Sequence, residues 1–597
     1  MTSGVIEASA PPKGSASKDW LRALELTARI EAAPSRILPT VIAELAQRQG
    51  AAPALVSDRE SFSYAELADR IGRYRRWARV QGLAKGDVVA LMMPNRPEYL
   101  AIWLGITSVG VVVALISPSL RGASLTHALK VAAPSQIIVD AACEAELMAA
   151  APLFAAEVWV HGQSRSGARR IDLVLDDGAA DGSPAGTPTV TLDDRALLIF
   201  TSGTTGLPKA ANVSHRRIMT WSGWFAGLMD TQAGDRLYNC LPLCHSVGGV
   251  AATGAALVAG ASVAIAEKFS ASRFWGDVRR WDCTIFQYIG ELCRYLLAAP
   301  AHPEERQHRL RIACGNGLTA DAWTPFQERF AIPRILEFYA ATEGAFSLFN
   351  VEGRPGAIGR IPPFLAHRFP AAIVRYDAES GAPTRGPDGF CVRCARGEAG
   401  EAIGRVSGGA GAGRFEGYTD DGESEKKLLR DVFAPGDAWM RTGDLMRQDG
   451  EGFFHFVDRI GDTFRWKGEN VATTEVGEAL CAVAGVSAAC VYGVTVPGAS
   501  GRAGMAALVT TGAFDLAGLP AHLAARLPDY ARPLFLRLVP ALEATDTFKP
   551  RRQALAGDGF DPGRIADPLY VYDRSTGAYA PLDAARFARI AAGAERL

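Results

Sequence analysis

The chain has 597 residues, of which 48% are hydrophobic and 21% are charged. These proportions are ordinary for a globular protein, so they exclude a chain that is disordered throughout. The 63 Lys and Arg residues balance 64 Asp and Glu residues, and the net charge of -1 excludes the strong basic field of a general nucleic-acid binder. We therefore expect several domains and no nucleic acid among the partners.

The first 36 residues differ in composition from the rest of the chain. They begin with an Ala-, Ser- and Pro-rich tail, followed by a helical pattern from about residue 20 to residue 33. The tail lacks the apolar core of a secretory signal peptide. Because the chain also has only ten Cys residues, we expect a reduced, cytoplasmic compartment, with peripheral contact at the inner face of the membrane left open.

From Pro39 onward, segments with apolar residues at helical spacing alternate with short β-branched runs such as DVVALMM, VVVALI and RALLIF. This alternation predicts an α/β fold in which helices flank largely parallel sheets. Two stretches without charged residues, 99–120 and 237–266, are long enough to raise the question of a membrane span. We interpret both as buried core, because the first changes from a helix pattern to a strand pattern and the second contains Pro242, His245 and several Gly.

Two later regions have their own patterns. Residues 355–440 hold short strands and turns, and their charged sequence ESEKKLL predicts a helix within a β-rich subdomain. After about residue 460, the runs VSAACVYGV, MAALVT and FLRLV predict a compact α+β unit. We divide the chain into a tail and helix at 1–36, a large domain at 37–460 and a small C-terminal domain at 461–597.

Cys391 and Cys394 form a CxxC sequence. A structural zinc site needs two further ligands at suitable spacing, and none lies nearby in the sequence. We expect no metal there, and we interpret CVRC as part of a short strand.

The most informative local feature is the sequence TSGTTGLPK, which directly follows the predicted strand at 196–200. Backbone N–H groups, hydroxyls and a lysine in one loop can bind a polyphosphate. The loop is not a Walker A sequence, because only two residues separate its glycines and Leu-Pro precedes the lysine. The candidate phosphate-binding residues are Thr201, Ser202, Gly203, Thr204, Thr205, Gly206 and Lys209.

This loop resembles the signature of the adenylate-forming superfamily, the AMP-binding enzymes that include acyl-CoA synthetases, luciferases and peptide-synthetase adenylation domains. Sequences similar to its other motifs follow in order, namely GNG at 315–317, YAATE at 339–343, TGD at 442–444, DRIGD at 458–462 and TDTFK at 545–549. GDTFRWKGENVATTEV and the stretch at 567–590 resemble the branch of fatty acid transport proteins and very-long-chain acyl-CoA synthetases.

The resemblance implies which residues contact the adenosine of ATP. Tyr339 would stack its flat ring on adenine. Asp444 would accept hydrogen bonds from the ribose hydroxyls, and Arg459 would reach the ribose or a phosphate. The loop that passes the adenine consists of Gly315, Asn316 and Gly317.

The resemblance also implies which residues act on the phosphates and the acid. Thr342 would contact the α-phosphate, and Glu343 would hold Mg²⁺, since a hard cation prefers carboxylate oxygen. Lys549 would bridge the substrate carboxylate and the α-phosphate, and His245 would occupy a gating position at the acyl pocket.

The resemblance implies a rotation of the small domain between two half-reactions. Gly461 takes the pivot position, where a glycine can absorb a large change in φ and ψ, and Asp462 follows it. The face that would serve the CoA half-reaction consists of Arg465, Trp466, Lys467 and Gly468.

The implied function is an ATP-dependent acyl-CoA synthetase that converts a long- or very-long-chain fatty acid, or a bulky lipid-like carboxylate, through acyl-AMP to the CoA thioester. Its partners are the acid, ATP, Mg²⁺ and CoA, and a homodimer is left open. Small residues after His245 suggest room for a long acyl group. Two alternatives remain: an acyl-AMP ligase that loads a carrier protein, and a fatty-acid uptake or binding protein with little catalysis.

Overall fold

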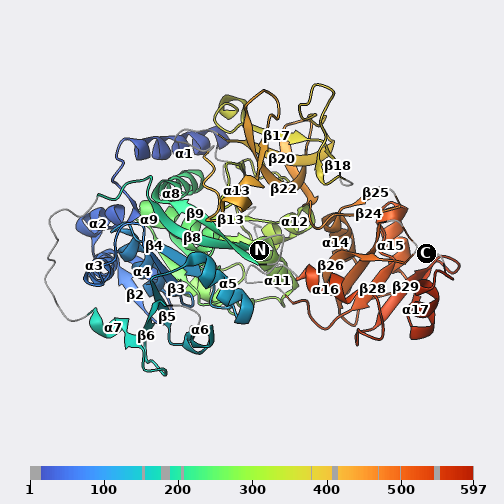
Figure 1. Cartoon of the computed structure of the whole chain (residues 1–597), viewed down its shortest axis with the longest axis horizontal. Coiled ribbons are helices and arrows are strands. Elements are labelled where there is room, and N and C mark those ends of the chain that lie inside the picture. The colour runs from blue at the N-terminus through green and yellow to red at the C-terminus, as the bar shows by residue number, and fades with distance from the viewer. Residues whose placement is uncertain are drawn as a thin grey trace, which may run out of the picture.

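The protein is described by a computed structural model with α/β architecture, as the sequence predicts. A large N-terminal part holds three main sheets, and a smaller C-terminal part with its own sheet lies at one end of the molecule (Figure 1). The residues described are 15–150, 155–175, 189–202, 207–377, 380–406, 414–467, 469–497, 499, 501–543 and 551–595.

The first large sheet has seven strands in the order β7-β6-β5-β3-β4-β8-β9. All neighbouring strands are parallel except β8 and β9, which form an antiparallel hairpin. The β-branched runs seen in the sequence form its buried centre. Its strands are β3 (Val88–Met92), β4 (Val112–Ile116), β5 (Gln136–Asp140), β6 (Glu157–His161), β7 (Arg169–Arg170), β8 (Arg195–Ser202) and β9 (Pro208–Ser214).

The second large sheet has eight strands in the order β15-β14-β13-β12-β10-β11-β1-β2. Its interior is parallel, and only the edge strands β2 and β15 run antiparallel to their neighbours. Its strands are β1 (Pro53–Val56), β2 (Ser61–Ser63), β10 (Arg236–Asn239), β11 (Ser262–Ile265), β12 (Ile285–Ile289), β13 (Ile312–Asn316), β14 (Ile335–Ala340) and β15 (Ser347–Asn350).

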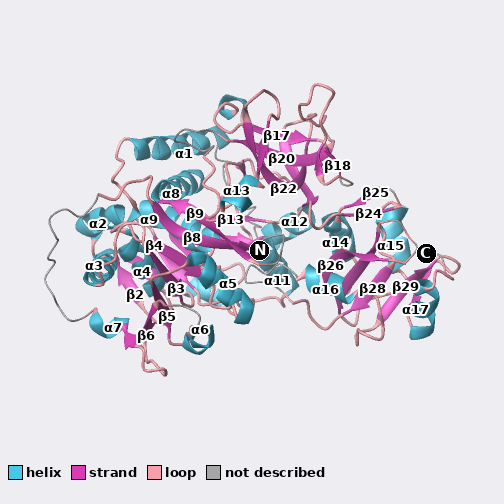
Figure 2. Cartoon of the chain, in the orientation of Figure 1, coloured by secondary structure: helices cyan, strands magenta, loops and turns pink. Residues whose placement is uncertain are grey.

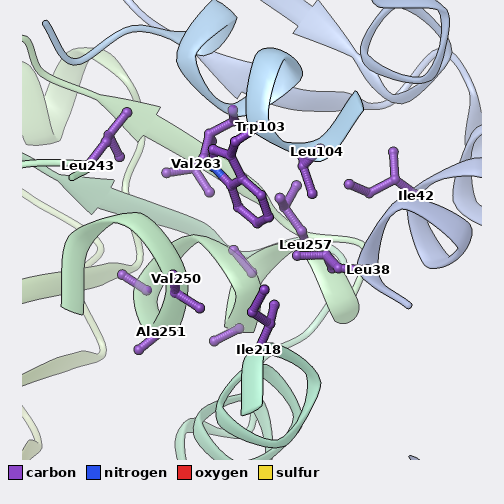
Figure 3. Packing of buried hydrophobic residues seen from close by; sticks show 14 of the residues in the cluster. Leu38, Ile42, Trp103, Leu104, Ile218, Leu243, Val250, Ala251, Leu257 and Val263 are labelled. Carbon is purple, nitrogen blue, oxygen red and sulfur yellow. The ribbon is translucent and has the colours of Figure 1, made fainter. Parts of the chain in front are cut away.

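Helices cover the faces of these two sheets (Figure 2). Where α4 and α9 meet over β11, Trp103 and Leu257 lie within one buried apolar cluster (Figure 3). The helices of this part are α1 (Ala16–Glu31), α2 (Leu38–Gln49), α3 (Tyr64–Val80), α4 (Pro97–Thr107), α5 (Gly122–Ala132), α6 (Glu144–Ala150), α7 (Ile171–Val174), α8 (His215–Met229), η2 (Val247–Ala252), α9 (Thr253–Val258), α10 (Phe274–Arg280), α11 (Gly290–Ala298) and α12 (Ala320–Arg329).

Helix α1 is integrated into the core rather than appended to it. It packs along α8 so closely that a Cβ added at Gly227 would lie 2.4 Å from the Cα of Ala23. Trp20 is buried and contacts the rings of Trp224 and Phe349 edge-on, with ring centroids 5.8 and 5.9 Å apart. Helix α1 therefore contributes packing energy to the large part.

The third sheet of the N-terminal part is antiparallel, with the order β16-β23-β22-β20-β17 and with β21 also paired to β22. It forms the β-rich subdomain at the top of Figure 1. Its elements are β16 (Gly359–Arg360), η3 (Pro363–Leu365), β17 (Ala371–Val374), β18 (Tyr376–Asp377), β19 (Ala382–Pro383), β20 (Ala399–Arg405), α13 (Asp421–Glu425), β21 (Leu428–Arg430), β22 (Ala438–Gln448) and β23 (Phe453–Arg459).

Two local predictions in this subdomain were wrong. The helix expected for ESEKKLL ends at Glu425, because Leu428 begins strand β21 and its sheet pairing with Met440 overrides the helix pattern. The CVRC sequence forms isolated bridges rather than a strand, and Cys391 and Cys394 are free thiols. Within the described part of the chain, no group of three His, Cys, Asp or Glu side chains could hold a metal ion.

The C-terminal part has a five-stranded sheet in the order β26-β27-β28-β29-β30, in which only β27 and β28 are parallel. The hairpin of β24 and β25 precedes it. The elements of this part are β24 (Phe464–Trp466), β25 (Glu469–Val471), α14 (Thr473–Cys481), β26 (Val486–Thr495), β27 (Arg502–Thr510), α15 (Leu519–Ala524), η4 (Asp529–Ala531), β28 (Phe535–Leu538), α16 (Arg552–Asp558), β29 (Leu569–Asp573), β30 (Ala578–Pro581) and α17 (Ala584–Ala591).

The two stretches without charged residues are buried core, as predicted. The first comprises α4 and β4, whose residues are all buried, and the second spans β10, η2, α9 and β11. No helix among the residues described has the length and apolar character needed to cross a membrane.

Candidate active site

Several of the predicted motifs lie where strands of both large sheets end. Thr201 lies at the end of β8, Asn316 ends β13 and Tyr339 lies next to the end of β14. Parallel strands commonly bind ligands at their carboxyl ends, because the following loops converge there. The antiparallel subdomain adds Asp444 from β22 and Arg459 from β23, which are paired in register.

Glu343 is buried and receives two partners from the subdomain. The Tyr418 hydroxyl donates a 2.6 Å hydrogen bond to Glu343 Oε1, and Lys427 Nζ lies 3.7 Å from the same oxygen. Thr201 is a further hydrogen-bond partner of Tyr418, so the end of β8 and Glu343 share one tyrosine. Burial and the neighbouring Glu343 carboxylate raise the pKa of Tyr418, which keeps its hydroxyl a donor at neutral pH.

The predicted phosphate loop is described only at its two ends. Lys209 on β9 pairs in register with Thr201 on β8, whereas Gly203, Thr204, Thr205 and Gly206 lie outside the described residues. The Lys209 ammonium forms an ion pair with Glu423 of α13. Since α13 follows Tyr418 in the chain, this ion pair connects the phosphate loop to the same subdomain segment that contacts Glu343.

Thr342 is held from two sides. Its hydroxyl lies 2.9 Å from that of Ser246, which joins it to the segment of His245. Arg217 of α8 donates hydrogen bonds of 2.7 Å to the Thr342 carbonyl and 3.1 Å to the Gly344 carbonyl. Because charged donors make strong hydrogen bonds when buried, Arg217 fixes the backbone on both sides of Glu343. The sequence analysis did not identify Arg217, since no local motif marks it.

Tyr339 and Asp444 contact each other directly. The Tyr339 hydroxyl donates to Asp444 Oδ2, and Arg459 Nε lies 3.7 Å from Asp444 Oδ1. The irregularity in β22 directly before Asp444 requires Gly443, whose φ of 77° is unfavourable for residues with a Cβ. The side chains predicted to bind adenine and ribose are therefore neighbours.

The GNG loop is positioned by a buried carboxylate that the sequence analysis did not identify. Glu337 on β14 accepts hydrogen bonds from the N–H groups of Gly317 and Leu318 and from the Tyr288 hydroxyl. Burial raises the pKa of Glu337 to about 8. Gly315 packs against Tyr288, where a Cβ would lie 2.3 Å from the Tyr288 carbonyl oxygen.

Asn316 Oδ1 is a buried acceptor without a hydrogen-bond partner among the described residues. Buried polar atoms normally have a partner, so an unpartnered acceptor at the end of β13 fits a ligand that carries N–H donors. The adenine amino group is such a donor.

His245 lies in the turn that leads into η2. Asn95, which lies just before α4, fixes this turn. The Asn95 amide donates to the Leu241 carbonyl and accepts from the Leu243 N–H, both at 2.8 Å. The small residues that follow are used for close packing: a Cβ at Gly249 would lie 1.8 Å from the Leu243 carbonyl oxygen. They do not by themselves provide the room for a long acyl group that the sequence suggested.

The predicted pivot and CoA face lie apart from these contacts. Gly461 and Asp462 form the turn after β23, and Arg465 and Lys467 are exposed on the β24–β25 hairpin. Trp466 is buried within the C-terminal core. The exposed side chains of the hairpin are therefore those of Arg465 and Lys467, and not the Trp466 indole ring. Gly468 and Lys549 lie outside the described residues.

Asp458, directly before Arg459, links the N-terminal part to the C-terminal part. It accepts hydrogen bonds from the Thr473 N–H and hydroxyl at the start of α14 and from the Thr463 hydroxyl. Burial raises the pKa of Asp458. This carboxylate caps a helix of the next domain and therefore stabilises one orientation of the two parts.

The site can accommodate Mg²⁺ only with help from a substrate. Glu343 supplies one buried carboxylate, the type of ligand that Mg²⁺ prefers, and it lies beside the ends of the phosphate loop. Mg²⁺ keeps several waters and commonly takes its remaining ligands from phosphate oxygens. The donor set therefore fits a Mg²⁺–nucleotide complex better than a free metal ion.

Comparison with known families gives two matches along the chain. The family described as AMP-binding enzyme matches residues 42–374, and the AMP-binding enzyme C-terminal domain matches residues 475–549. The chain is 42% identical to long-chain fatty acid transport protein 3 of Homo sapiens, over 86% of this chain and 76% of that protein. It is 39% identical to long-chain fatty acid transport protein 1 of Mus musculus, over 93% of this chain and 88% of that protein.

Solved structures with the same fold include the anthranilate CoA ligase AuaEII in complex with anthranoyl-AMP. That structure superposes with a TM-score of 0.75 at 18% identity, covering 87% of this chain and 96% of the ligase. ATP-bound MatB from Rhodopseudomonas palustris gives a TM-score of 0.73 at 23% identity, with coverage of 87% and 98%.

Proposed function

The chain belongs to the AMP-binding enzyme family, and from that premise we propose that it is an ATP-dependent acyl-CoA synthetase. Its substrate is a long- or very-long-chain fatty acid, or a bulky lipid-like carboxylate, and acyl-AMP is the intermediate. The observation that carries this proposal is that Tyr339 contacts Asp444 near the end of β14, while Thr342 and Glu343 follow in the loop after that strand. The long acyl chain is supported by relatives that are named long-chain fatty acid transport proteins.

In the first half-reaction, a carboxylate oxygen of the acid attacks the α-phosphorus of ATP. The bond from that phosphorus to the bridging oxygen breaks, and pyrophosphate leaves. We assign the adenosine to Tyr339, Asn316, Asp444 and Arg459, and the pyrophosphate portion to the 201–209 loop. Positioning and charge neutralisation account for most catalysis of this kind. Glu343 would hold Mg²⁺, which when bound would supply positive charge to the phosphate oxygens.

Lys549 is proposed as the residue that orients the acid, because a compact ammonium on a flexible stem can contact a carboxylate and a phosphate together. His245 is proposed to gate the acyl pocket. Its turn is joined to the α-phosphate residue through the contact between Ser246 and Thr342, which supports this assignment.

In the second half-reaction, the thiol sulfur of CoA attacks the acyl carbon of acyl-AMP. The bond from that carbon to the AMP oxygen breaks, AMP leaves, and the thiol proton passes to solvent. We propose that residues 461–597 rotate about Gly461 and Asp462 against the domain at 37–460, which carries the β-rich subdomain at about 355–440. The rotation would bring Arg465, Lys467 and Gly468 to the site, with Trp466 packed beneath them.

Two alternative functions differ from this one in the acceptor or in catalysis. An acyl-AMP ligase would pass the acyl group to a carrier protein, and a fatty-acid uptake protein would bind the acid with little turnover.

We also propose peripheral contact with a membrane and a homodimer. Sedimentation with lipid vesicles and light scattering of the pure protein test these two.

The decisive experiment measures pyrophosphate release from ATP and Mg²⁺ with a panel of acids, each with and without CoA. The panel runs from short to very long acyl chains and includes aromatic and steroid acids. We expect long-chain acids to give AMP and acyl-CoA in a CoA-dependent reaction. Pyrophosphate release without thioester would favour the carrier-protein ligase, and no release with any acid would favour the uptake protein.

A further inference from the structure

Lys427 points toward the nucleotide site from the segment between α13 and β21. Strand β21 pairs with β22 so that the Lys427 carbonyl accepts a hydrogen bond from the Arg441 N–H, directly before Thr442. Lys427 Nζ lies 3.4 Å from the Thr442 carbonyl oxygen and 3.7 Å from Glu343 Oε1. This ammonium therefore lies between the Glu343 carboxylate and the part of β22 that carries Asp444.

Its neighbour Lys426 has the opposite orientation. The Lys426 side chain is 72% exposed and pairs with Glu423 at 2.6 Å, whereas the Lys427 side chain is 28% exposed. The two lysines have the same charge and adjacent backbone positions, so they differ mainly in whether they face the site. Lys426 is consequently a matched control for Lys427.

The contacts of Lys427 Nζ with described residues are too long to satisfy its ammonium group. Charge-assisted N–H···O contacts are typically about 2.7–2.9 Å, and both contacts of Nζ exceed this range. Glu343 Oε1 already accepts a hydrogen bond from Tyr418. An ammonium has three donors and a flexible stem, so Lys427 can move to an additional anion without losing a short ion pair.

Charge balance indicates which anion that is. ATP brings several negative charges to Glu343, and one Mg²⁺ together with Lys209 offsets only part of them. Lys209 is itself paired with Glu423. Because the Lys427 ammonium stands beside the carboxylate that would carry Mg²⁺, phosphate oxygens that share this Mg²⁺ would come within its reach.

We propose that Lys427 is a phosphate-binding residue of this enzyme, whose Nζ contacts the phosphate oxygens of Mg²⁺-bound ATP and of the adenylate. The inference rests on the proposed nucleotide site and adds a cation to it that the motifs at 201–209 and 545–549 do not include. A structural lysine that merely neutralises Glu343 would behave differently, because it would support the site whether or not phosphates are bound.

The test compares calorimetric binding of Mg²⁺-ATP and of adenosine to the full chain without any acid. For Lys427→Met we expect ATP binding to weaken at least roughly tenfold and adenosine binding to stay unchanged, as for loss of one charge-assisted contact. Lys427→Arg should retain most of the ATP affinity because it keeps the charge. Lys426→Met should match the wild type for both ligands.

Other outcomes would overturn the inference. Equal weakening of ATP and adenosine would mean that Lys427 has a structural role, and an unchanged ATP affinity would mean that it does not contact phosphate. Thermal unfolding of Lys427→Met identifies a variant that has lost its fold, in which case Lys427→Gln is measured in its place. If the wild type itself binds neither ligand, the proposed nucleotide site fails together with the inference. If the wild type binds both and Lys427→Met is normal, only the inference fails.

Discussion

The nucleotide site and the β24–β25 hairpin differ in how their functional side chains are held. Around the nucleotide site, Tyr339 contacts Asp444 and Glu343 contacts Tyr418, and each pair joins residues far apart in the sequence. On the hairpin, Arg465 and Lys467 are exposed. A site held by buried contacts is preorganised for its ligand, whereas an exposed hairpin can act only where a domain movement carries it. We therefore expect the adenylation step to depend on fixed contacts and the thioester step to depend on the hinge.

The largest effect is expected for Glu343→Gln, which would test the fixed side of this comparison. Loss of the carboxylate charge should lower the rate of acyl-AMP formation by roughly 10²–10³, the usual effect of removing one electrostatic group from a catalytic site. Pyrophosphate release in single-turnover experiments measures it. Glu425→Gln is the control, since Glu425 is an exposed partner of Arg430. A variant that formed acyl-AMP at the wild-type rate would contradict the role of Glu343.

A smaller and more selective effect is expected for Gly461→Pro, which would test the proposed rotation about Gly461. Proline fixes φ and should hinder rotation at the turn after β23. Thioester formation from preformed acyl-AMP should slow at least about tenfold, while pyrophosphate release in the first turnover stays near the wild-type rate. The two steps are separated by adding CoA after the first turnover. Equal loss in both steps would show that the turn supports the nucleotide site instead.

How much of this site the sequence could predict depends on whether a residue belongs to a local motif. Tyr339, Glu343 and Asp444 stand in short motifs with a chemical pattern, and the structure brings Tyr339 and Asp444 into contact. Arg217 and Tyr418 could not be found in this way. Arg217 lies in α8, a helix with almost all of its residues buried, and only tertiary packing brings it to the carbonyl of Thr342.

The same distinction holds for the fold. Buried parallel strands such as β3 and β4 were predictable because runs of β-branched residues reflect burial on both faces. The segment ESEKKLL was not, since its helical charge pattern competes with strand pairing to β22, and pairing is a nonlocal contact. The packing of Trp20 against Trp224 was equally hidden, because nothing local marks a helix that joins a distant core.

Glu337→Gln tests the fixed site at the carboxylate that holds the backbone of Gly317 and Leu318. Burial raises the Glu337 pKa to about 8, so the folded protein holds a proton that the unfolded chain, with a carboxyl pKa near 4.5, releases. The contribution to stability is therefore present at low pH and is lost as the pH rises through about 8. Wild-type stability should fall by roughly 4 kcal/mol more than that of Glu337→Gln between pH 5 and pH 9, because each pH unit between the two pKa values costs about 1.4 kcal/mol. Urea unfolding at several pH values measures this, and parallel pH curves for the two proteins would contradict it.

The smallest effect is expected for Lys467→Asn, which removes one exposed charge from the hairpin. Lys467 has a φ of 53°, a left-handed conformation that asparagine tolerates better than most residues, so the substitution should preserve the turn. CoA carries several phosphates, and loss of one exposed cation should raise the KM for CoA only about three- to tenfold. The KM for ATP and the rate of pyrophosphate release should stay unchanged, because the nucleotide site does not include this hairpin before the hinge moves. Increasing salt should reduce the difference between wild type and variant, since an exposed charge is screened. If the variant instead raised the KM for ATP, the hairpin would already contact the nucleotide, and the division between a fixed site and a mobile face would be wrong.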